Sequence, residues 1–168
     1  MRWTGLLAAL ALVAGPAAGR PLAYSPPRLT AEGWGGLRVG MAEADAVRRF
    51  RLHVEQADDA DCHVLFSADS RLMVMIRDGK VGSVAVFGLP RILTDRGLHI
   101  GSTEAEVRRA YGAALKVEPN PYDDTPAHYL TWWAAPGRRG IMYETDAKGR
   151  VTDIHAGDET IGWTDGCG

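Results

Sequence analysis

The sequence predicts an α+β fold built from two tandem repeats, each a short helix packed on an antiparallel meander of three to four strands. Three observations predict it. Residues 36–50 align without gaps on residues 97–111, both segments have the pattern of a helix start, and both precede short apolar segments separated by turn residues. We place repeat unit 1 at residues 33–90 and repeat unit 2, with a C-terminal tail, at residues 91–168.

Residues 1–19 have the tripartite pattern of a secretory signal peptide. Arg2 is positive, a run of Leu, Ala, Val and Gly follows, and small residues precede Arg20. The apolar run is roughly eleven residues long, whereas a membrane-spanning helix needs about 20. We therefore expect a periplasmic or secreted protein whose mature chain begins near Arg20. No cysteine follows the apolar run, so we expect no lipid attachment and no membrane anchor.

About 150 residues remain after residue 19, enough for one domain with a sizeable core or for two small fused lobes. The net charge is −2, and the arginines are scattered among acidic residues. Nucleic acid and anionic membrane surfaces are therefore not expected as partners. Three prolines lie in residues 20–32, which we expect to form an extended and poorly ordered N-terminal segment.

Each repeat is expected to begin with a short apolar segment that ends at a glycine and leads into a helix. In the second copy Thr103 and Glu106 have capping-box spacing, in which the threonine accepts from a backbone N–H and the glutamate reaches back. Ala42 stands at the position of Thr103 in the first copy, so that helix should begin less firmly. Apolar residues at i and i+4 give each helix one buried stripe, namely Ala46 with Phe50 and Val107 with Tyr111.

The segments after each helix have the composition of antiparallel strands. The expected strands lie at residues 62–66, 72–76 and 80–87 in the first copy and at residues 128–133, 140–145 and 150–155 in the second. Asp78-Gly79 is a strong two-residue hairpin signal. His63 and His128 also align, so the correspondence extends beyond the helices and favours an internal duplication.

The two cysteines, Cys62 and Cys167, indicate first a disulfide if the chain folds in an oxidising compartment. The bond would close a loop of about 100 residues, nominally worth about 4–5 kcal/mol in the chain-entropy model. The alternative is a reactive thiol at Cys62 that pairs with the neighbouring His63. Adjacent residues on a strand point to opposite faces, so these two side chains do not meet easily.

Residues 100–107, followed by Tyr111 and Gly112, resemble the opening of the small envelope proteins of the beta-lactamase-inhibitor-protein and outer-membrane-assembly-lipoprotein (SmpA/OmlA) type. The tandem arrangement is closer to the inhibitor protein, itself a duplicated helix-and-strands unit. The resemblance implies an exported non-enzymatic protein that binds other proteins through a sheet face and protruding loops. The chain departs from the inhibitor pattern, which has a disulfide inside each unit, and from the lipoprotein pattern, which has a lipid-attachment cysteine.

An aromatic pair in the second repeat is the first candidate binding feature. Trp132 and Trp133 are adjacent on an expected strand, so one ring should lie in the core and the other on the outer sheet face. Tyr129 lies an even number of residues from Trp133 on this strand, so both side chains should lie on the same face. An exposed tryptophan beside a tyrosine is a common anchor for a partner protein. The alternative is that a helix or the other copy covers both faces.

A loop in the second repeat is the second candidate. Residues 120–126 form an insertion relative to the first copy and contain Tyr122, Asp123 and Asp124. Loops on rigid scaffolds often carry function, and two acids with a tyrosine could recognise a basic partner. A solvated loop without a binding role is the alternative.

The histidines show no spacing typical of a zinc site, and the chain has no nucleophile motif or phosphate-binding glycine loop. We therefore expect no metal, no cofactor and no catalytic residues. The hypothesis that we favour is an exported non-enzymatic module that binds another protein, as an inhibitor or as an envelope-associated component. The alternative is a small secreted hydrolase or small-ligand binder that uses a cleft between the two repeats.

Overall fold

The computed structural model describes residues 25–54, 61–122, 126–134, 138–163 and 167. The predicted signal peptide at residues 1–19 lies outside the described residues, as do Asp123 and Asp124. The described part of the N-terminal segment, residues 25–32, is anchored to the rest of the fold, contrary to the expectation that it is poorly ordered. Leu29 is fully buried, and its N–H donates to the carbonyl of Leu93.

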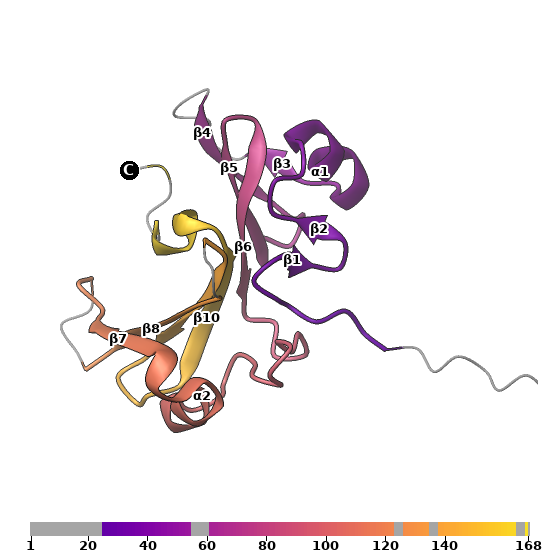
Figure 1. Cartoon of the computed structure of the whole chain (residues 1–168). Helices are drawn as coiled ribbons and strands as arrows, with labels where there is room; N and C mark the ends of the chain where they lie inside the picture. Colours follow the sequence, from indigo (N-terminus) through magenta and orange to yellow (C-terminus); the bar gives the residue numbers. More distant parts are fainter. Residues whose placement is uncertain (1–24, 55–60, 123–125, 135–137, 164–166, 168) are drawn as a thin grey trace, which may run out of the picture.

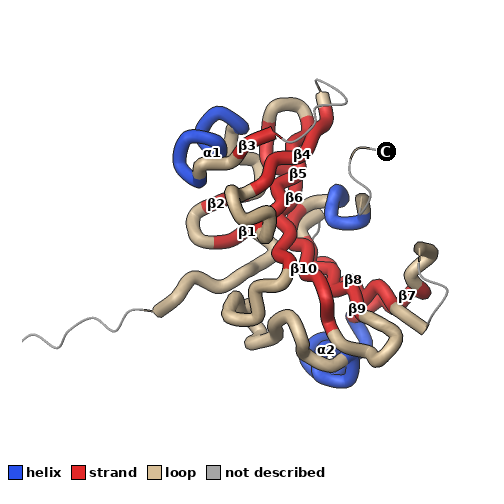
Figure 2. The backbone as a smooth tube through the Cα atoms, turned by 180° about the vertical axis from the view of Figure 1, so that it is seen from behind, coloured by secondary structure: helices blue, strands red, loops and turns tan. Residues whose placement is uncertain are grey.

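One antiparallel sheet of eight strands organises the described part of the chain, in the order β3-β4-β5-β6-β10-β9-β8-β7 (Figure 1). Its strands are β3 (His53–Val54), β4 (Cys62–Phe66), β5 (Leu72–Arg77), β6 (Lys80–Phe87), β7 (Leu115–Pro119), β8 (His128–Trp133), β9 (Gly140–Thr145) and β10 (Val151–Gly157). A separate hairpin joins β1 (Gly33–Trp34) to β2 (Leu37–Arg38). The helical elements are α1 (Glu43–Phe50), α2 (Glu104–Tyr111) and the short 3-10 turns η1 (Gly112–Ala114) and η2 (Glu159–Gly162). Figure 2 shows α1 and α2 at opposite ends of the sheet.

The predicted fold class is wrong, because the strands do not form two helix-on-meander repeats. They form one continuous sheet, in which β6 pairs with β10 from Phe87 opposite Asp153 to Ser83 opposite Gly157. Both strands bury most of their residues on both sides. An unpaired edge would leave the backbone N–H and C=O groups of such strands unsatisfied, and pairing the two edges removes that cost.

The two helices begin in the same way. The N–H of Glu43 donates to the carbonyl of Gly79, and the N–H of Glu104 donates to that of Gly149. Each helix start is therefore tied to the turn that precedes a central strand. The capping box of Thr103 is confirmed, and Ala42 provides no side-chain cap, as predicted. The duplication itself stays a prediction from the aligned sequence.

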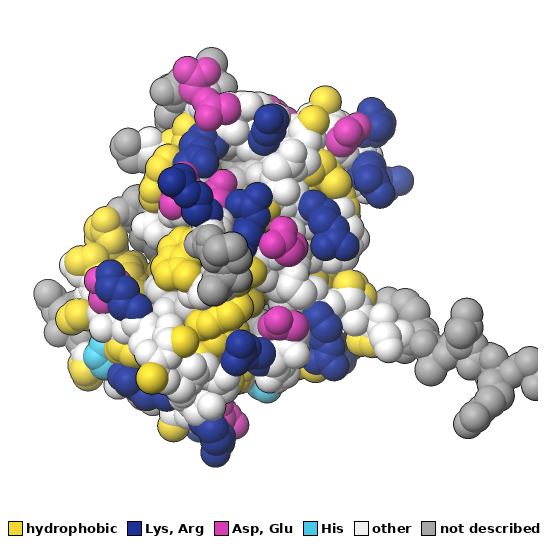
Figure 3. Space-filling model, in the orientation of Figure 1, with side chains coloured by type: hydrophobic (Ala, Val, Ile, Leu, Met, Phe, Trp, Pro, Cys, Tyr) yellow, Lys and Arg dark blue, Asp and Glu magenta, His cyan; other side chains and the backbone are white. Residues whose placement is uncertain are grey.

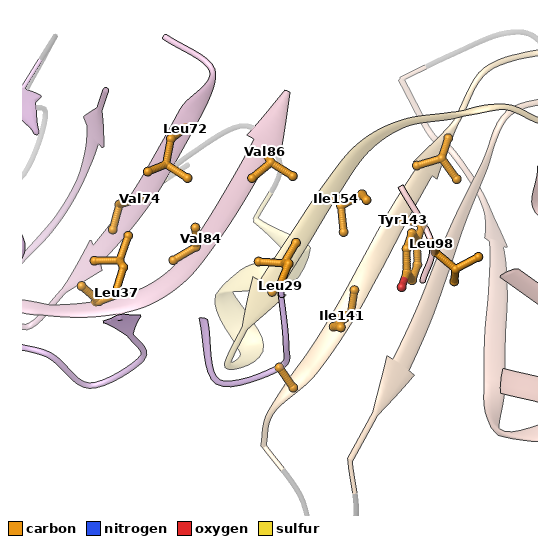
Figure 4. Packing of buried hydrophobic residues seen from close by; sticks show 14 of the residues in the cluster. Leu29, Leu37, Leu72, Val74, Val84, Val86, Leu98, Ile141, Tyr143 and Ile154 are labelled. Atoms are coloured by element: carbon orange, nitrogen blue, oxygen red, sulfur yellow. The ribbon is translucent and has the colours of Figure 1, made fainter. Parts of the chain in front are cut away.

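The core lies between the sheet and a cover made of the helices, the β1–β2 hairpin and the segment that joins the two halves. Figure 4 shows Leu37 toward the strands of the first half, and Leu29 toward the strands at the centre of the sheet. Leu98 lies beside Tyr143. Tyr143 is fully buried, and its hydroxyl lies 2.8 Å from that of Tyr111. Burial raises the pKa of Tyr143, so the pair remains protonated and provides its own hydrogen bond inside the core.

The predicted disulfide between Cys62 and Cys167 is confirmed, with the two Cα atoms 5.7 Å apart. The alternative of a reactive thiol at Cys62 is therefore wrong. The bond lies on the face of the sheet opposite the helices, where the Sγ of Cys167 is 3.5 Å from the Sδ of Met75. It connects the end of the chain to the outer part of the first half.

Replacing both cysteines by serine should lower the free energy of unfolding by about 4 kcal/mol, because the bond spans 105 residues and restricts the unfolded chain. Urea unfolding of the oxidised protein and of the double variant measures the difference. Wild type unfolded in the presence of a thiol reductant is the control and should match the variant. A loss below about 1 kcal/mol would contradict the expected role of the bond.

The pH dependence of stability should report the docking of α2. Burial acts to raise the pKa of Glu104, but hydrogen bonds from Arg108 and His128 lower it below its usual value. Stability from a carboxylate with a lowered pKa is present above its unfolded pKa and is lost as pH falls through the folded pKa. Glu104→Gln should therefore be less stable than wild type by about 1–2 kcal/mol at neutral pH.

Thermal unfolding at pH 7 and near pH 3 tests this expectation for Glu104. The gap between wild type and Glu104→Gln should close toward acidic pH. Glu32→Gln, the same change at a side chain that is 59% exposed, is the control and should show a small gap throughout. An equal gap for Glu104→Gln at both pH values would show that the lost interaction is not the charged one.

Candidate functional site

The candidate site lies on the face of the sheet opposite the helices, which we call the outer face. Successive residues of a strand alternate between faces. On β8, Leu130 and Trp132 pack in the core cluster, so Tyr129, Thr131 and Trp133 point to the outer face. The strand therefore divides its aromatic residues between the core and the outer face, as the alternation predicts.

A hollow of about 210 Å³ opens on the outer face over β7, β8, β9 and η2. It is lined by Lys116, Glu118, Tyr129, Thr131, Trp133, Met142, Ile161 and Gly162. Figure 3 shows hydrophobic side chains gathered on the side of the molecule where η2 lies. Trp133 is 38% exposed, whereas Met142, which lines the same hollow, is buried.

The η2 turn forms one wall of the hollow and is held firmly on the sheet. The N–H of Asp158 donates to the carbonyl of Gly82, and Ile161 is fully buried. A Cβ atom on Gly82 would lie 2.8 Å from the Oγ1 of Thr160, so this close approach requires a glycine. Arg77 adds ion pairs to Asp158 and Glu159 at 3.2 and 3.0 Å.

The opposite wall of the hollow depends on another glycine. A Cβ atom on Gly140 would lie 2.7 Å from the ring of Trp133, so the indole lies across the bare backbone of β9. The Lys116 Nζ and Glu118 Oε1 atoms, 2.8 Å apart, form an exposed ion pair at the rim. The hollow therefore combines an aromatic wall with a charged rim on a rigid sheet.

A group of ionisable side chains adjoins the hollow on the same face. Glu144 lies opposite Tyr129 on one side and opposite Asp153 on the other. The Nε2 atom of His155 lies 2.9 Å from the Oε1 atom of Glu144, at ion-pair distance but out of line for a hydrogen bond. Burial raises the pKa of Asp153, and the neighbouring Glu144 carboxylate adds to this, against a hydrogen bond from Thr152.

The structure brings together some of the residues predicted for binding and separates others. Tyr129 and Trp133 line the same hollow. Trp132 lies on the core side, where its ring centroid is 5.2 Å from that of Tyr111 and Arg96 stacks on it. Tyr122 is 68% exposed in the loop between β7 and β8, and the neighbouring Asp123 and Asp124 lie outside the described residues. A binding role for each of these residues stays a prediction.

Sequence reasoning missed most of the residues around the hollow. Those that line it or adjoin it are Lys116, Glu118, Thr131, Met142, Glu144, Asp153, His155, Ile161 and Gly162. Alternation along β9 was a usable signal for Met142 and Glu144, because alternate residues of this strand share the sheet face on which Tyr129 lies. The position of η2 had no comparable signal, because long-range contacts place it.

A second hollow, of about 360 Å³, lies beside the β1–β2 hairpin and is lined in part by Arg28, Trp34 and Arg38. Most of its remaining wall is glycine and proline, which offer few side-chain contacts to a partner. We therefore place the candidate site at the outer face. Within the described ranges, no group of three or more His, Cys, Asp or Glu side chains is arranged to hold a metal ion. No helix among these residues has the length and apolar character needed to cross a membrane.

Comparison with known proteins gives no family. No family model and no curated protein matches the chain. An extracellular protein containing an SCP domain from Bacillus anthracis is 8% identical, with a TM-score of 0.47 over 72% of this chain and 44% of that chain. A DUF4309 family protein (YjgB) from Bacillus subtilis is 14% identical, with a TM-score of 0.49 over 75% of this chain and 84% of that chain. The chain thus spans less than half the length of the SCP-domain protein, and function has to be argued from the site itself.

Proposed function

We propose that this chain is an exported protein that binds another protein through the outer face of its sheet, without catalysing a reaction. The observation that carries the proposal is the exposed Trp133 indole, which forms a wall of a hollow on a rigid strand. Tryptophan, tyrosine and methionine are enriched where proteins bind one another, and Tyr129 and Met142 line the same hollow.

The occupant that fits the hollow is one large side chain from a protruding loop of the partner. Pockets for drug-sized ligands have volumes of about 300–1,000 Å³, and the hollow has about 210 Å³. The mixed lining, with an apolar wall and the Lys116–Glu118 pair at the rim, suits a side chain with an apolar stem and a polar end. The resemblance of residues 100–107 to the inhibitor-protein and assembly-lipoprotein families supports the same class of activity.

The alternative of a hydrolase or small-ligand binder requires a cleft between the two repeats. At that place β6 and β10 are hydrogen-bonded to each other. The imidazole of His155 lies beside a carboxylate but is only 4% exposed, so it does not reach a substrate on the outer face. Binding is therefore the function that the geometry supports best.

Export is supported by two independent features. Residues 1–19 have the signal-peptide pattern, and the Cys62–Cys167 disulfide is of the kind that forms and persists in oxidising compartments. The proposed partner is accordingly a protein of the cell envelope or the surroundings of the cell.

Replacing Trp133 by alanine should weaken partner binding by about 30-fold, because a central tryptophan typically contributes about 2 kcal/mol or more. Immobilised wild type and variant are incubated with envelope extract, and captured proteins are quantified by mass spectrometry. The control is Val54→Ala, since Val54 is a 45% exposed side chain on β3 at the other edge of the sheet. The proposal requires a protein that wild type and Val54→Ala capture equally and Trp133→Ala does not. Equal capture by all three proteins would contradict it.

Expression of the whole chain in a bacterial host should yield a mature protein that begins near Arg20. The mass and the N-terminal sequence of the protein in the periplasmic or culture fraction measure this directly. A chain that lacks residues 2–19 is the control and should remain in the cytoplasm with reduced cysteines. Recovery of wild type as an uncleaved cytoplasmic chain would rule out export by this segment.

A further inference from the structure

A row of acidic and aromatic residues crosses the outer face beside the hollow. Strand pairing places Glu118, Tyr129, Glu144, Asp153 and Phe87 opposite one another on the adjacent strands β7, β8, β9, β10 and β6. We call this set the acidic–aromatic row. Its members Glu118 and Tyr129 also line the hollow, so the row and the hollow form one continuous surface.

The row holds more negative charge than its surroundings balance. Among the residues that the structure describes, Lys116 pairs with Glu118 and His155 with Glu144, but no lysine or arginine pairs with Glu144 or Asp153. Like charges placed directly opposite each other destabilise a sheet. Burial and the Glu144 carboxylate raise the pKa of Asp153, and they outweigh the hydrogen bond from Thr152 and the nearby His155, which both lower it.

We propose that the acidic–aromatic row binds an arginine or lysine side chain of the partner protein. The apolar stem of that side chain packs against Trp133 and Met142 in the hollow, and its cationic head lies beside Tyr129 and Glu144. A cation over the face of a tyrosine and beside a carboxylate gains cation–π and ionic stabilisation together. The inference rests on the proposed function and specifies the chemistry of the partner.

The charge complementarity gives the two carboxylates opposite effects in the free and bound protein. In the free protein, Glu144 and Asp153 repel each other and lower stability. In the complex the partner's cation neutralises them. A carboxylate with a purely structural role would instead lower stability when removed, so the two roles predict shifts of opposite sign.

Thermal unfolding of the purified protein tests whether Asp153 lowers the stability of the free protein. Asp153→Asn should raise Tm by roughly 2–4 °C at neutral pH, which is the shift typical of relieving one unfavourable interaction in a chain of this size. The gain should shrink as pH falls and wild-type Asp153 becomes protonated. Asp45→Asn, the same change on an exposed residue of α1, is the control and should not raise Tm. A lower Tm for Asp153→Asn would overturn the proposal.

Binding of a defined probe tests whether Glu144 and Asp153 bind a cationic side chain. The probe is an end-blocked peptide, Gly-Ser-Arg-Ser-Gly, and its control carries neutral citrulline in place of arginine. NMR titration follows the Trp133 indole N–H signal, which is assigned by its loss in Trp133→Phe. The arginine peptide should shift this signal, the citrulline peptide should not, and Asp153→Asn and Glu144→Gln should each weaken binding about tenfold.

Three results would overturn the inference. These are no shift with the arginine peptide at millimolar concentration, equal binding of the citrulline peptide, and binding of spermidine in place of the peptide. Capture of the envelope partner separates this inference from the proposed function. If Trp133→Ala abolishes capture while Glu144→Gln and Asp153→Asn retain it, the function stands and the cationic contact does not. If Trp133→Ala has no effect on capture, the proposed function itself fails.

Discussion

The ladder between β6 and β10 is the interaction on which the rest of the molecule depends. It joins the last strand of the first half to the last strand of the second half, with Val86 opposite Ile154 and Ala85 opposite His155. Because register fixes which side chains share a face, this ladder places Val86 and Ile154 in the core and His155 on the outer face. The acidic–aromatic row crosses five strands only because β6 and β10 are neighbours. A slip of one residue would move Asp153 into the core and expose Ile154.

The outer face also depends on contacts made far along the chain. The wall that Ile161 and Gly162 give to the hollow exists because η2 is fixed over the centre of the sheet. Arg77, on the first half, holds η2 through two carboxylates, and its guanidinium lies 5.6 Å from the ring centroid of Trp163. The disulfide fixes the end of the chain to the same half. Residues of the first half of the sheet thus hold η2, which forms a wall of the hollow beside the strands of the second half.

Local features of the sequence could be predicted, and pairings between distant segments could not. The bounds of β4, β6, β8 and β9 match the expected strands, because alternation and hairpin residues act over short distances. The same alternation placed Trp133 and Tyr129 on one face. Single-strand patterns carry no information on which edge pairs with which, so the β6–β10 ladder, and with it the fold class, was missed. A bulge between Val151 and Asp153 also shifts the parity of β10, which hid the position of Asp153.

Three carboxylate–histidine pairs show how this chain uses charge. Two of them fix the helices: Glu43 lies 2.8 Å from His63, and Glu104 lies 2.9 Å from His128. Each carboxylate lies in the first turn of a helix and pairs with a histidine on a strand, so each pair holds its helix on the sheet. The third pair, Glu144 with His155, lies on the outer face and contacts neither α1 nor α2.

The third pair also differs from the other two because a second carboxylate lies directly across from it. Asp153 contributes no ion pair to the described fold, and its burial makes the ionised form costly. Asp153 therefore has no ion pair comparable to those of Glu43 and Glu104, and the proposed cationic side chain of a partner is a group that could provide one.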